Sequence, residues 1–211
     1  MTVSFDLFDT LVTVERPGDP GDAVAAALRD RGVSVPDDWG TAFRESHREL
    51  QRGREYSLIE HVDDALASRD VRVDHDAVSA AVCEAFDPTT VRTRNGASEA
   101  VAAAADYGPV GVLSNCSVPG LVERTLDRSD LHAEDFDAVV ASVDCGWRKP
   151  FDGAFECVAD RLGVSPAALH HVGDDPRTDG GLRTLGGTPV LLSDVPLADL
   201  PSYFEEALVC R

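Results

Sequence analysis

The fold is decided by a short run, Thr2-Val3-Ser4-Phe5-Asp6-Leu7, which has the composition of a β-strand and reaches its first carboxylate at Asp6. The chain then turns through Asp9-Thr10. In open α/β sheets the ligand site lies at the carboxyl ends of the strands. The run therefore predicts a sheet strand that carries a functional acid at its end.

After Asn95-Gly96 the sequence alternates between helical and strand patterns. Helices are expected at residues 97–106, 119–126, 151–162 and 180–185, and strands at 110–113, 138–142, 169–172 and 189–192. Short apolar strands separated by helices favour a parallel sheet that is covered on both faces, with right-handed crossovers. The predicted fold class is α/β.

Between Glu15 and about Thr93 the pattern of apolar residues, prolines and glycines changes. A hinge-like stretch rich in proline and glycine, residues 17–21, is followed by apolar residues at helical spacing. Four helices are expected, at 22–31, 37–52, 57–68 and 74–86, with Pro36-Asp37-Asp38 and Asp87-Pro88 as start and stop signals. This segment is predicted to be a helical insertion in the sheet domain.

Polar residues follow four of the predicted strands, namely Asp6, Ser114-Asn115, the loop with Lys149, and Asp174-Asp175. Strand ends of a parallel sheet meet in one crevice. An aspartate there can act as a nucleophile when cations neutralise it and its substrate. Asp174 and Asp179 could hold a divalent cation together with Asp6, because Mg²⁺ prefers carboxylate oxygens, waters and phosphate.

Two further side chains suit an anionic substrate. Lys149 is the only lysine of the chain, and its compact ammonium can lie among carboxylates and contact a phosphoryl or carboxyl oxygen. Ser114 can present its hydroxyl to an anionic oxygen.

Four segments together resemble the motifs of the haloacid dehalogenase superfamily of hydrolases, in the family order. They are Phe5-Asp6-Leu7-Phe8-Asp9-Thr10-Leu11, Leu113-Ser114-Asn115, Arg148-Lys149-Pro150, and Val172-Gly173-Asp174 with Asp179. The resemblance implies a Rossmann-like, doubly wound parallel sheet core, residues 1–14 and 94–211. It also implies a four-helix cap, residues 15–93, between the first and second motifs.

The resemblance also implies roles for individual residues. Asp6 would be the nucleophile, Thr10 would support the first loop, and Lys149 would orient Asp6. Ser114 and Asn115 would bind the transferred group. The implied cofactor is Mg²⁺, with Asp6, Asp174, Asp179 and the backbone carbonyl of Phe8 as ligands. Asp179, or Asp175 in its place, would hold the metal or orient Lys149.

One departure from the family pattern concerns general acid–base catalysis. The family's phosphatases carry a second aspartate two residues past the nucleophile, where this chain has Phe8. Such a group typically contributes about 10²–10⁴-fold, so phosphatase turnover is expected to suffer. Asp9 is one residue further on, but adjacent residues of an extended chain point to opposite sides.

Phe8 also resembles the pattern of the superfamily's dehalogenases, which have an aromatic residue there and no metal. Arg44 falls where those enzymes place an arginine for the substrate's carboxylate. Against this reading, a metal-free site would leave Asp174, Asp175 and Asp179 repelling one another. A Mg²⁺-dependent phosphohydrolase of a small phosphorylated metabolite is therefore ranked first, a metal-independent 2-haloacid dehalogenase second, and a noncatalytic member that binds a phosphorylated ligand or a protein third.

Composition limits the partners and the compartment. Asp and Glu total 38 against 19 Lys and Arg, a net charge of −19, which disfavours nucleic acid and anionic membranes. The aspartate-rich, lysine-poor composition resembles proteins of extreme halophiles. Five cysteines without metal or disulfide spacing, and no long apolar span, favour a soluble cytoplasmic protein. A small-molecule substrate and a monomer or homodimer are expected.

Overall fold

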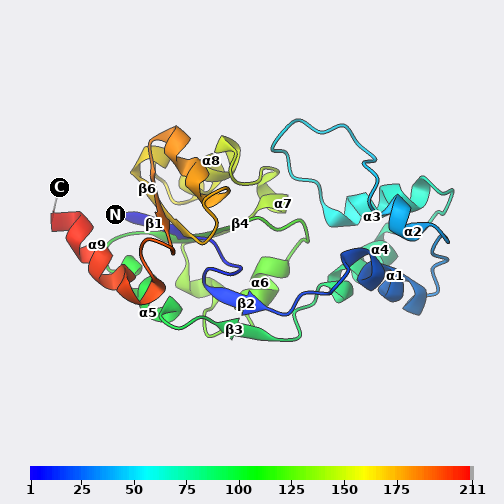
Figure 1. Ribbon diagram of the computed structural model, residues 1–211, viewed down its shortest axis with the longest axis horizontal. Helices are drawn as coiled ribbons and strands as arrows, with labels where there is room; N and C mark the ends of the chain where they lie inside the picture. Colours follow the sequence, from blue (N-terminus) through cyan, green and yellow to red (C-terminus); the bar gives the residue numbers. More distant parts are fainter. Residues whose placement is uncertain (210–211) are drawn as a thin grey trace.

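The computed structural model describes residues 1–209; Cys210 and Arg211 lie outside the described residues. Its centre is a five-stranded parallel sheet in the order β5-β4-β1-β6-β7 (Figure 1). The strands are β1 (Thr2–Phe5), β4 (Val110–Ser114), β5 (Ala138–Ala141), β6 (Leu169–Gly173) and β7 (Thr188–Leu191). The predicted α/β class and the parallel sheet are confirmed.

Helices cover both faces of the sheet. One face carries α8 (Asp152–Arg161) and the 3-10 segment η3 (Asp179–Leu185), and the other carries α5 (Ala97–Ala105), α6 (Leu121–Leu126) and α9 (Leu200–Val209) (Figure 1). Short elements complete this part, namely α7 (Ser142–Cys145), η1 (Ala133–Asp135), η2 (Pro166–Ala168) and η4 (Leu197–Asp199).

The side chains of the strands alternate between the two faces, as the period of two in a strand requires. In β4, Val110 and Val112 pack on the α5 side, whereas Leu113 packs on the α8 side. In β1, Val3 and Phe5 belong to the α5 side. Because Asp6 follows Phe5 directly, this alternation turns Asp6 toward the α8 side.

Four helices lie between β2 (Val12–Val14) and β3 (Val91–Thr93). They are α1 (Pro20–Asp30), α2 (Trp39–Ala42), α3 (Leu58–Ala67) and α4 (His75–Ala85), which Phe86 caps, and we call residues 20–86 the helical insertion. β2 and β3 form an antiparallel ribbon that joins the two connections to this insertion. The ribbon was not predicted, because runs of three residues are too short to show a period.

The predicted helix at 37–52 is wrong beyond one turn, because α2 spans only Trp39–Ala42. The residues that follow are mostly polar, and up to Arg52 most of them are exposed, so they offer no continuous apolar face for a helix to bury. Residues 43–57 instead form a long loop between α2 and α3, which extends away from the helices of the insertion and reaches the core beside α7 (Figure 1). We call residues 53–55 of this loop the strap.

Toward the carboxyl-terminal end, one predicted helix differs from the structure and one helix was not predicted. The helix expected at 180–185 is the 3-10 segment η3, where Gly181 lies against Pro150 so closely that a Cβ would come within 2.3 Å of the Pro150 carbonyl. The helix α9 was not predicted. It packs beside α5 and inserts Phe204 into the core.

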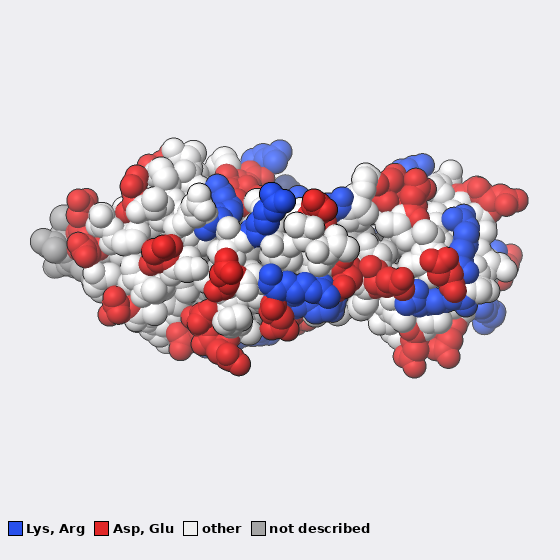
Figure 2. All heavy atoms as spheres, turned by 90° about the horizontal axis from the view of Figure 1, so that it is seen from below, with Lys and Arg blue, Asp and Glu red and all other residues white. Residues whose placement is uncertain are grey.

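The surface is acidic over both the core and the insertion (Figure 2). Among residues 1–209 no helix is both long enough and apolar enough to cross a membrane. Cys83, Cys116, Cys145 and Cys157 carry free thiols.

Candidate active site

Asp6 lies directly after the central strand β1, and its backbone N–H donates to the carbonyl of Val172 at 2.8 Å. Its carboxylate is 3.0 Å from Lys149 Nζ, and the side chain keeps 14% of its surface exposed. Burial raises the pKa of Asp6 to about 6, although the Lys149 ammonium opposes the shift. The group is thus largely desolvated but still reachable from solvent, as a nucleophile must be.

Lys149 is buried and bridges two carboxylates, with Nζ 3.0 Å from Asp6 and 2.7 Å from Asp179. Burial would lower its pKa, but the two carboxylates outweigh burial and raise it. Lys149 is therefore a charged ammonium within the protein.

Two contacts fix the backbone of the Lys149 loop. The Asn115 amide donates to the carbonyl of Lys149 at 3.0 Å and accepts from its N–H at 2.8 Å. Asn115 also lines the same cleft as Asp6, so its amide positions the Lys149 backbone at the edge of the site.

The strap holds the same loop from the other side. The Arg148 N–H donates to Gly53 O at 3.0 Å, the Glu55 N–H donates to Gly146 O at 3.0 Å, and the Arg54 guanidinium lies 4.8 Å from the centre of the Trp147 ring. Gly53 has φ of +90°, and a Cβ there would lie 2.3 Å from the Phe151 ring. Only glycine fits this close approach.

Asp179 is fully buried, and protein groups use both its oxygens. Oδ1 faces Lys149 Nζ and His171 Nε2 at 2.7 and 3.2 Å, and Oδ2 accepts from the Asp175 N–H at 3.0 Å. Gly173 permits this placement, since a Cβ there would come within 2.2 Å of the Asp179 carboxyl group. This environment suits a residue that orients Lys149, the alternative role, better than a metal ligand.

His171 is a part of the site that sequence reasoning missed. It lies in β6, fully buried; its Nδ1 is 2.8 Å from Ser4 Oγ, and its ring packs 5.4 Å from that of Phe155. Since Nε2 faces the Asp179 carboxylate, we assign the ring proton to Nε2 and a hydrogen bond donated by the Ser4 hydroxyl to Nδ1. The signal in the sequence was a pair of adjacent histidines, His170 and His171, inside an otherwise apolar strand.

Burial and the neighbouring charges shift the pKa values of the groups in this cluster. Burial lowers the pKa of His171 to about 4, and the Lys149 charge adds to the effect. Burial alone would raise the pKa of Asp179, but the His171 hydrogen bond and the Lys149 ammonium outweigh it and hold that pKa below its usual range. The cluster at neutral pH is a neutral imidazole beside an ammonium–carboxylate pair.

Replacing His171 by Gln should flatten the pH dependence of stability. The folded-state pKa of about 4 lies below the unfolded value of 6.5, so His171 costs no stability above pH 6.5 and costs progressively more as pH falls toward 4. Between pH 7.5 and pH 5 the wild type should lose roughly 2 kcal/mol more than His171→Gln. Denaturant unfolding at both pH values in high salt measures the difference.

The matched control for this measurement is His75→Gln, because His75 is exposed and its pKa is raised by Asp63. If the free energies of unfolding of His171→Gln and the wild type fall by the same amount between pH 7.5 and pH 5, the assignment of a buried neutral imidazole is contradicted.

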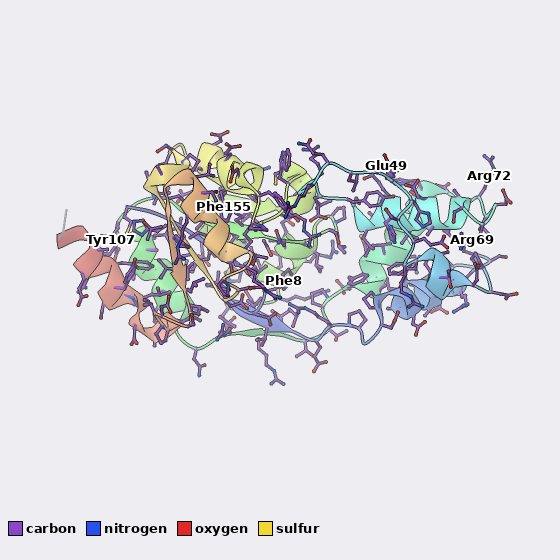
Figure 3. All side chains as sticks on the ribbon, turned by 45° about the horizontal axis from the view of Figure 1, so that its top comes forward. Phe8, Glu49, Arg69, Arg72, Tyr107 and Phe155 are labelled. Carbon is purple, nitrogen blue, oxygen red and sulfur yellow. The ribbon has the colours of Figure 1, made fainter. Side chains whose placement is uncertain are left out.

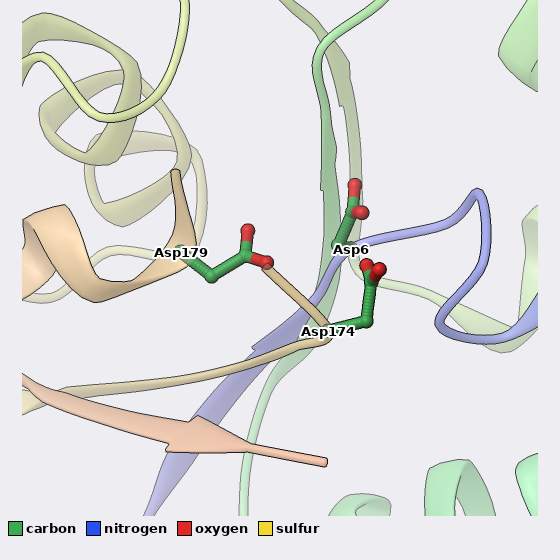
Figure 4. A group of neighbouring side chains, drawn as sticks. All are labelled: Asp6, Asp174 and Asp179. Carbon is green, nitrogen blue, oxygen red and sulfur yellow. The ribbon is translucent and has the colours of Figure 1, made fainter. Parts of the chain in front are cut away.

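A second acid lies across from Asp6. Asp174 is exposed at the end of β6, and its carboxylate accepts from the buried Thr10 hydroxyl at 3.0 Å. Asp6, Asp174 and Asp179 each offer one oxygen, and these three oxygens lie within 4.8 Å of one another. Figure 4 shows the three side chains converging from β1, β6 and the start of η3.

These groups lie on a cleft of about 640 Å³ that the core and the helical insertion both line. Ser114 Oγ is buried on this cleft and has no hydrogen-bond partner among the described residues. Phe8 is half-buried, also lines the cleft, and lies between the core and the insertion (Figure 3). The unpartnered hydroxyl suits an anionic oxygen of a substrate.

The extended chain assumed at Asp9 is wrong. Asp9 adopts φ of +63°, in the left-handed region, and lines the cleft with Asp6 and Phe8. Its carboxylate pairs with Arg16 at 2.6 Å. A turn through Asp9-Thr10 was expected, but the left-handed conformation of Asp9 was not; Leu7 O closes the turn by accepting from the N–H groups of Leu11 and Val12.

Arg44, the other predicted substrate-binding residue, is not brought to this site. It is exposed just after α2, with its guanidinium over Gly40, and it does not line the cleft. The helix α2 ends at Ala42, so Arg44 lies outside it. Of the described residues that line the cleft, Arg16 is the one arginine.

Several solved structures share this fold. A 2-haloacid dehalogenase from Pseudomonas syringae pv. Tomato has 21% sequence identity and a TM-score of 0.64 over 98% of each chain. A haloacid dehalogenase family enzyme from Bacteroides thetaiotaomicron, solved with magnesium and inorganic phosphate, has 15% identity and a TM-score of 0.58 over 90% of this chain and 92% of that one. A protein described as a predicted phosphoglycolate phosphatase from Haemophilus somnus has 17% identity and a TM-score of 0.58 over 97% of this chain and 96% of that one.

At these identities the likeness shows the fold alone. The search of curated proteins found no match. The family model of the haloacid dehalogenase-like hydrolases, however, matches residues 1–183, which include all four motifs and the converging acids. The chain therefore belongs to the haloacid dehalogenase-like hydrolases.

Proposed function

We propose that the protein is a Mg²⁺-dependent phosphohydrolase that uses Asp6 as the nucleophile on a small phosphomonoester. The observation that carries this proposal is the meeting of three acids, whose oxygens lie within 4.8 Å of one another beside the buried Lys149 ammonium. Two of them, Asp6 and Asp174, keep exposed surface toward the cleft. A cation between acids and a phosphoryl group is the arrangement that phosphoryl transfer uses.

The donor set fits Mg²⁺, which prefers oxygen ligands and keeps several waters. Asp6 and Asp174 are the direct ligands we assign, with the Phe8 carbonyl as the predicted third. Asp179 has both oxygens bonded within the protein, so we assign it to orienting Lys149. Bound Mg²⁺ supplies charge neutralisation between the acids and the phosphoryl group.

In the proposed reaction, each residue of the site has a separate role. An oxygen of Asp6 attacks phosphorus as the bond to the alcohol oxygen breaks, and a solvent water protonates the departing alkoxide, since Phe8 offers no proton. A second water then attacks phosphorus, which releases phosphate and regenerates the Asp6 carboxylate. Lys149 and the Ser114 hydroxyl donate to the phosphoryl oxygens, where negative charge is concentrated.

The helical insertion acts in this proposal as a cap, with residues 15–93 as the predicted unit. It supplies Phe43, Leu58 and Phe86 to the cleft, and the strap ties it to the Lys149 loop. Cap closure would exclude water while the site is assembled.

A second candidate, a metal-independent 2-haloacid dehalogenase, is favoured by Phe8, because a halide needs no proton to leave. In that reading Asp6 would displace the halide from carbon, and Arg16 would be the cleft arginine available to a carboxylate. Asp174, which lies close to Asp6, counts against a site without a cation.

One assay separates the two. In high salt, phosphate release from a phosphomonoester panel should appear with Mg²⁺ and disappear with EDTA, and no halide should be released from 2-chloropropionate. Halide release that survives EDTA and falls in Arg16→Ala would establish the dehalogenase instead. No release of either product, with thermal stability unchanged by Mg²⁺ and phosphate, would indicate a noncatalytic member.

A further inference from the structure

The walls of the cleft beyond Asp6 are apolar. Phe8, Val118 and Leu121 face it from the core, and Phe43, Leu58 and Phe86 face it from the helical insertion. All except the buried Val118 are half-buried side chains that pack against the main core. Its volume of about 640 Å³ is that of a small-molecule site.

Three of the polar side chains on the same walls are already engaged within the protein. The Thr125 hydroxyl donates to Leu121 O at 2.7 Å, the Thr178 hydroxyl donates to Asp175 O at 3.3 Å, and Asn115 holds the Lys149 backbone. A substrate rich in hydroxyl groups would give up hydrogen bonds to water and find few uncharged partners on these walls. Unpaired buried polar groups are costly.

The charges of the lining also limit the substrate. Its five acidic residues are Asp6, Asp9, Glu15, Asp174 and Asp175, and its two basic residues are Arg16 and Lys149. Both basic residues are already paired, Arg16 with Asp9 and Lys149 with Asp6 and Asp179. A second anionic group on the substrate would meet an excess of carboxylates.

We infer that the substrate is a phosphomonoester with one anionic group and a compact apolar alcohol part, either aromatic or branched alkyl. This inference rests on the proposed function. The phosphoryl group lies at Asp6, Lys149 and Ser114, and the alcohol part packs between the aromatic and aliphatic side chains of the core and the insertion. Sugar phosphates and phosphorylated carboxylic acids are poor substrates.

Benzyl phosphate and glycerol 1-phosphate test this choice, because both are esters of primary alcohols and so have leaving groups of similar reactivity. With Mg²⁺ in high salt, kcat/KM should be at least about tenfold higher for benzyl phosphate, the size of discrimination that an apolar pocket achieves. Phosphoglycolate, with its second anionic group, should be the poorest of the three. Equal or better turnover of glycerol 1-phosphate or phosphoglycolate would overturn the inference.

Binding to Asp6→Asn, measured by calorimetry, decides the inference without turnover. Benzyl phosphate should bind at least about tenfold more tightly than glycerol 1-phosphate, and equal affinities would overturn the apolar assignment. If no ester is hydrolysed by the wild type, the proposed function fails, while this binding ratio still reports on the cleft.

Substitutions in the wall provide the matched comparison. Phe86→Ala and Leu58→Ala should each lower the ratio of benzyl to glycerol ester binding by about fivefold or more, because each removes apolar surface from one wall. Leu50→Ala is the control, since Leu50 is 46% exposed and does not line the cleft. Ratios that stay unchanged in both wall variants would place the alcohol part elsewhere.

Discussion

Asp6→Asn should reduce phosphate release by at least about 10⁴-fold, a loss typical of removing a nucleophile. The amide has no anionic oxygen, so it cannot form the covalent intermediate. The measurement is steady-state phosphate release with Mg²⁺ in high salt, with the burst amplitude as a second readout.

The same variant should be as stable as the wild type at pH 7, or more stable. Burial raises the pKa of Asp6 to about 6, so the ionised carboxylate is less favourable in the folded protein than in the unfolded chain. That contribution is stabilising below the unfolded pKa of 3.8 and is lost as pH rises through 6. At neutral pH the neutral amide of Asp6→Asn therefore removes an unfavourable contribution to the stability of the folded protein.

Asp106→Asn is the matched control, because Asp106 is exposed at the end of α5 and does not line the cleft. It should keep wild-type turnover. Residual activity of Asp6→Asn above a few per cent of the wild type would exclude Asp6 as the nucleophile.

Lys149→Met should destabilise the protein by about 3–5 kcal/mol and abolish turnover, because it leaves the mostly buried Asp6 and the fully buried Asp179 without their shared cation. Methionine nearly preserves the length of the side chain, so the effect reports the charge rather than a cavity. Denaturant unfolding at pH 7 in high salt measures it.

The pH dependence identifies the cause of this loss. Without the ammonium, Asp6 and Asp179 take up protons at higher pH than in the wild type, and protonated carboxyl groups need no ion partner. The stability deficit of Lys149→Met should therefore be largest near pH 7 and shrink toward pH 4. A deficit that is constant over this range would indicate a packing defect instead.

The contrasting variant is Arg177→Met, which removes an exposed ion pair with Asp175. Water and salt screen such a pair, so its stability should stay close to that of the wild type. Equal effects of the two variants would contradict the special role of burial at Lys149.

The sequence determined the fold class and the meeting of the motifs, because strand periodicity and the rule for parallel sheets are local signals. Asp6, Ser114, Lys149 and Asp174 each follow or adjoin a short apolar run, and the structure brings them to one cleft. The third acid, Asp179, was expected beside them and is there. No single run showed what each side chain would bond to.

The tertiary structure alone decided the roles of the surrounding residues. The oxygens of Asp179 contact Lys149, His171 and the Asp175 N–H, and these partners come from different segments of the chain. Arg16 lines the cleft and Arg44 does not, and α2 stops after one turn, before Arg44. The chemistry of the side chains and the periodicity of apolar residues can be read along the sequence. The burial of a side chain, its ion-pair partner and the end of a helix depend on contacts with residues that are distant in the sequence.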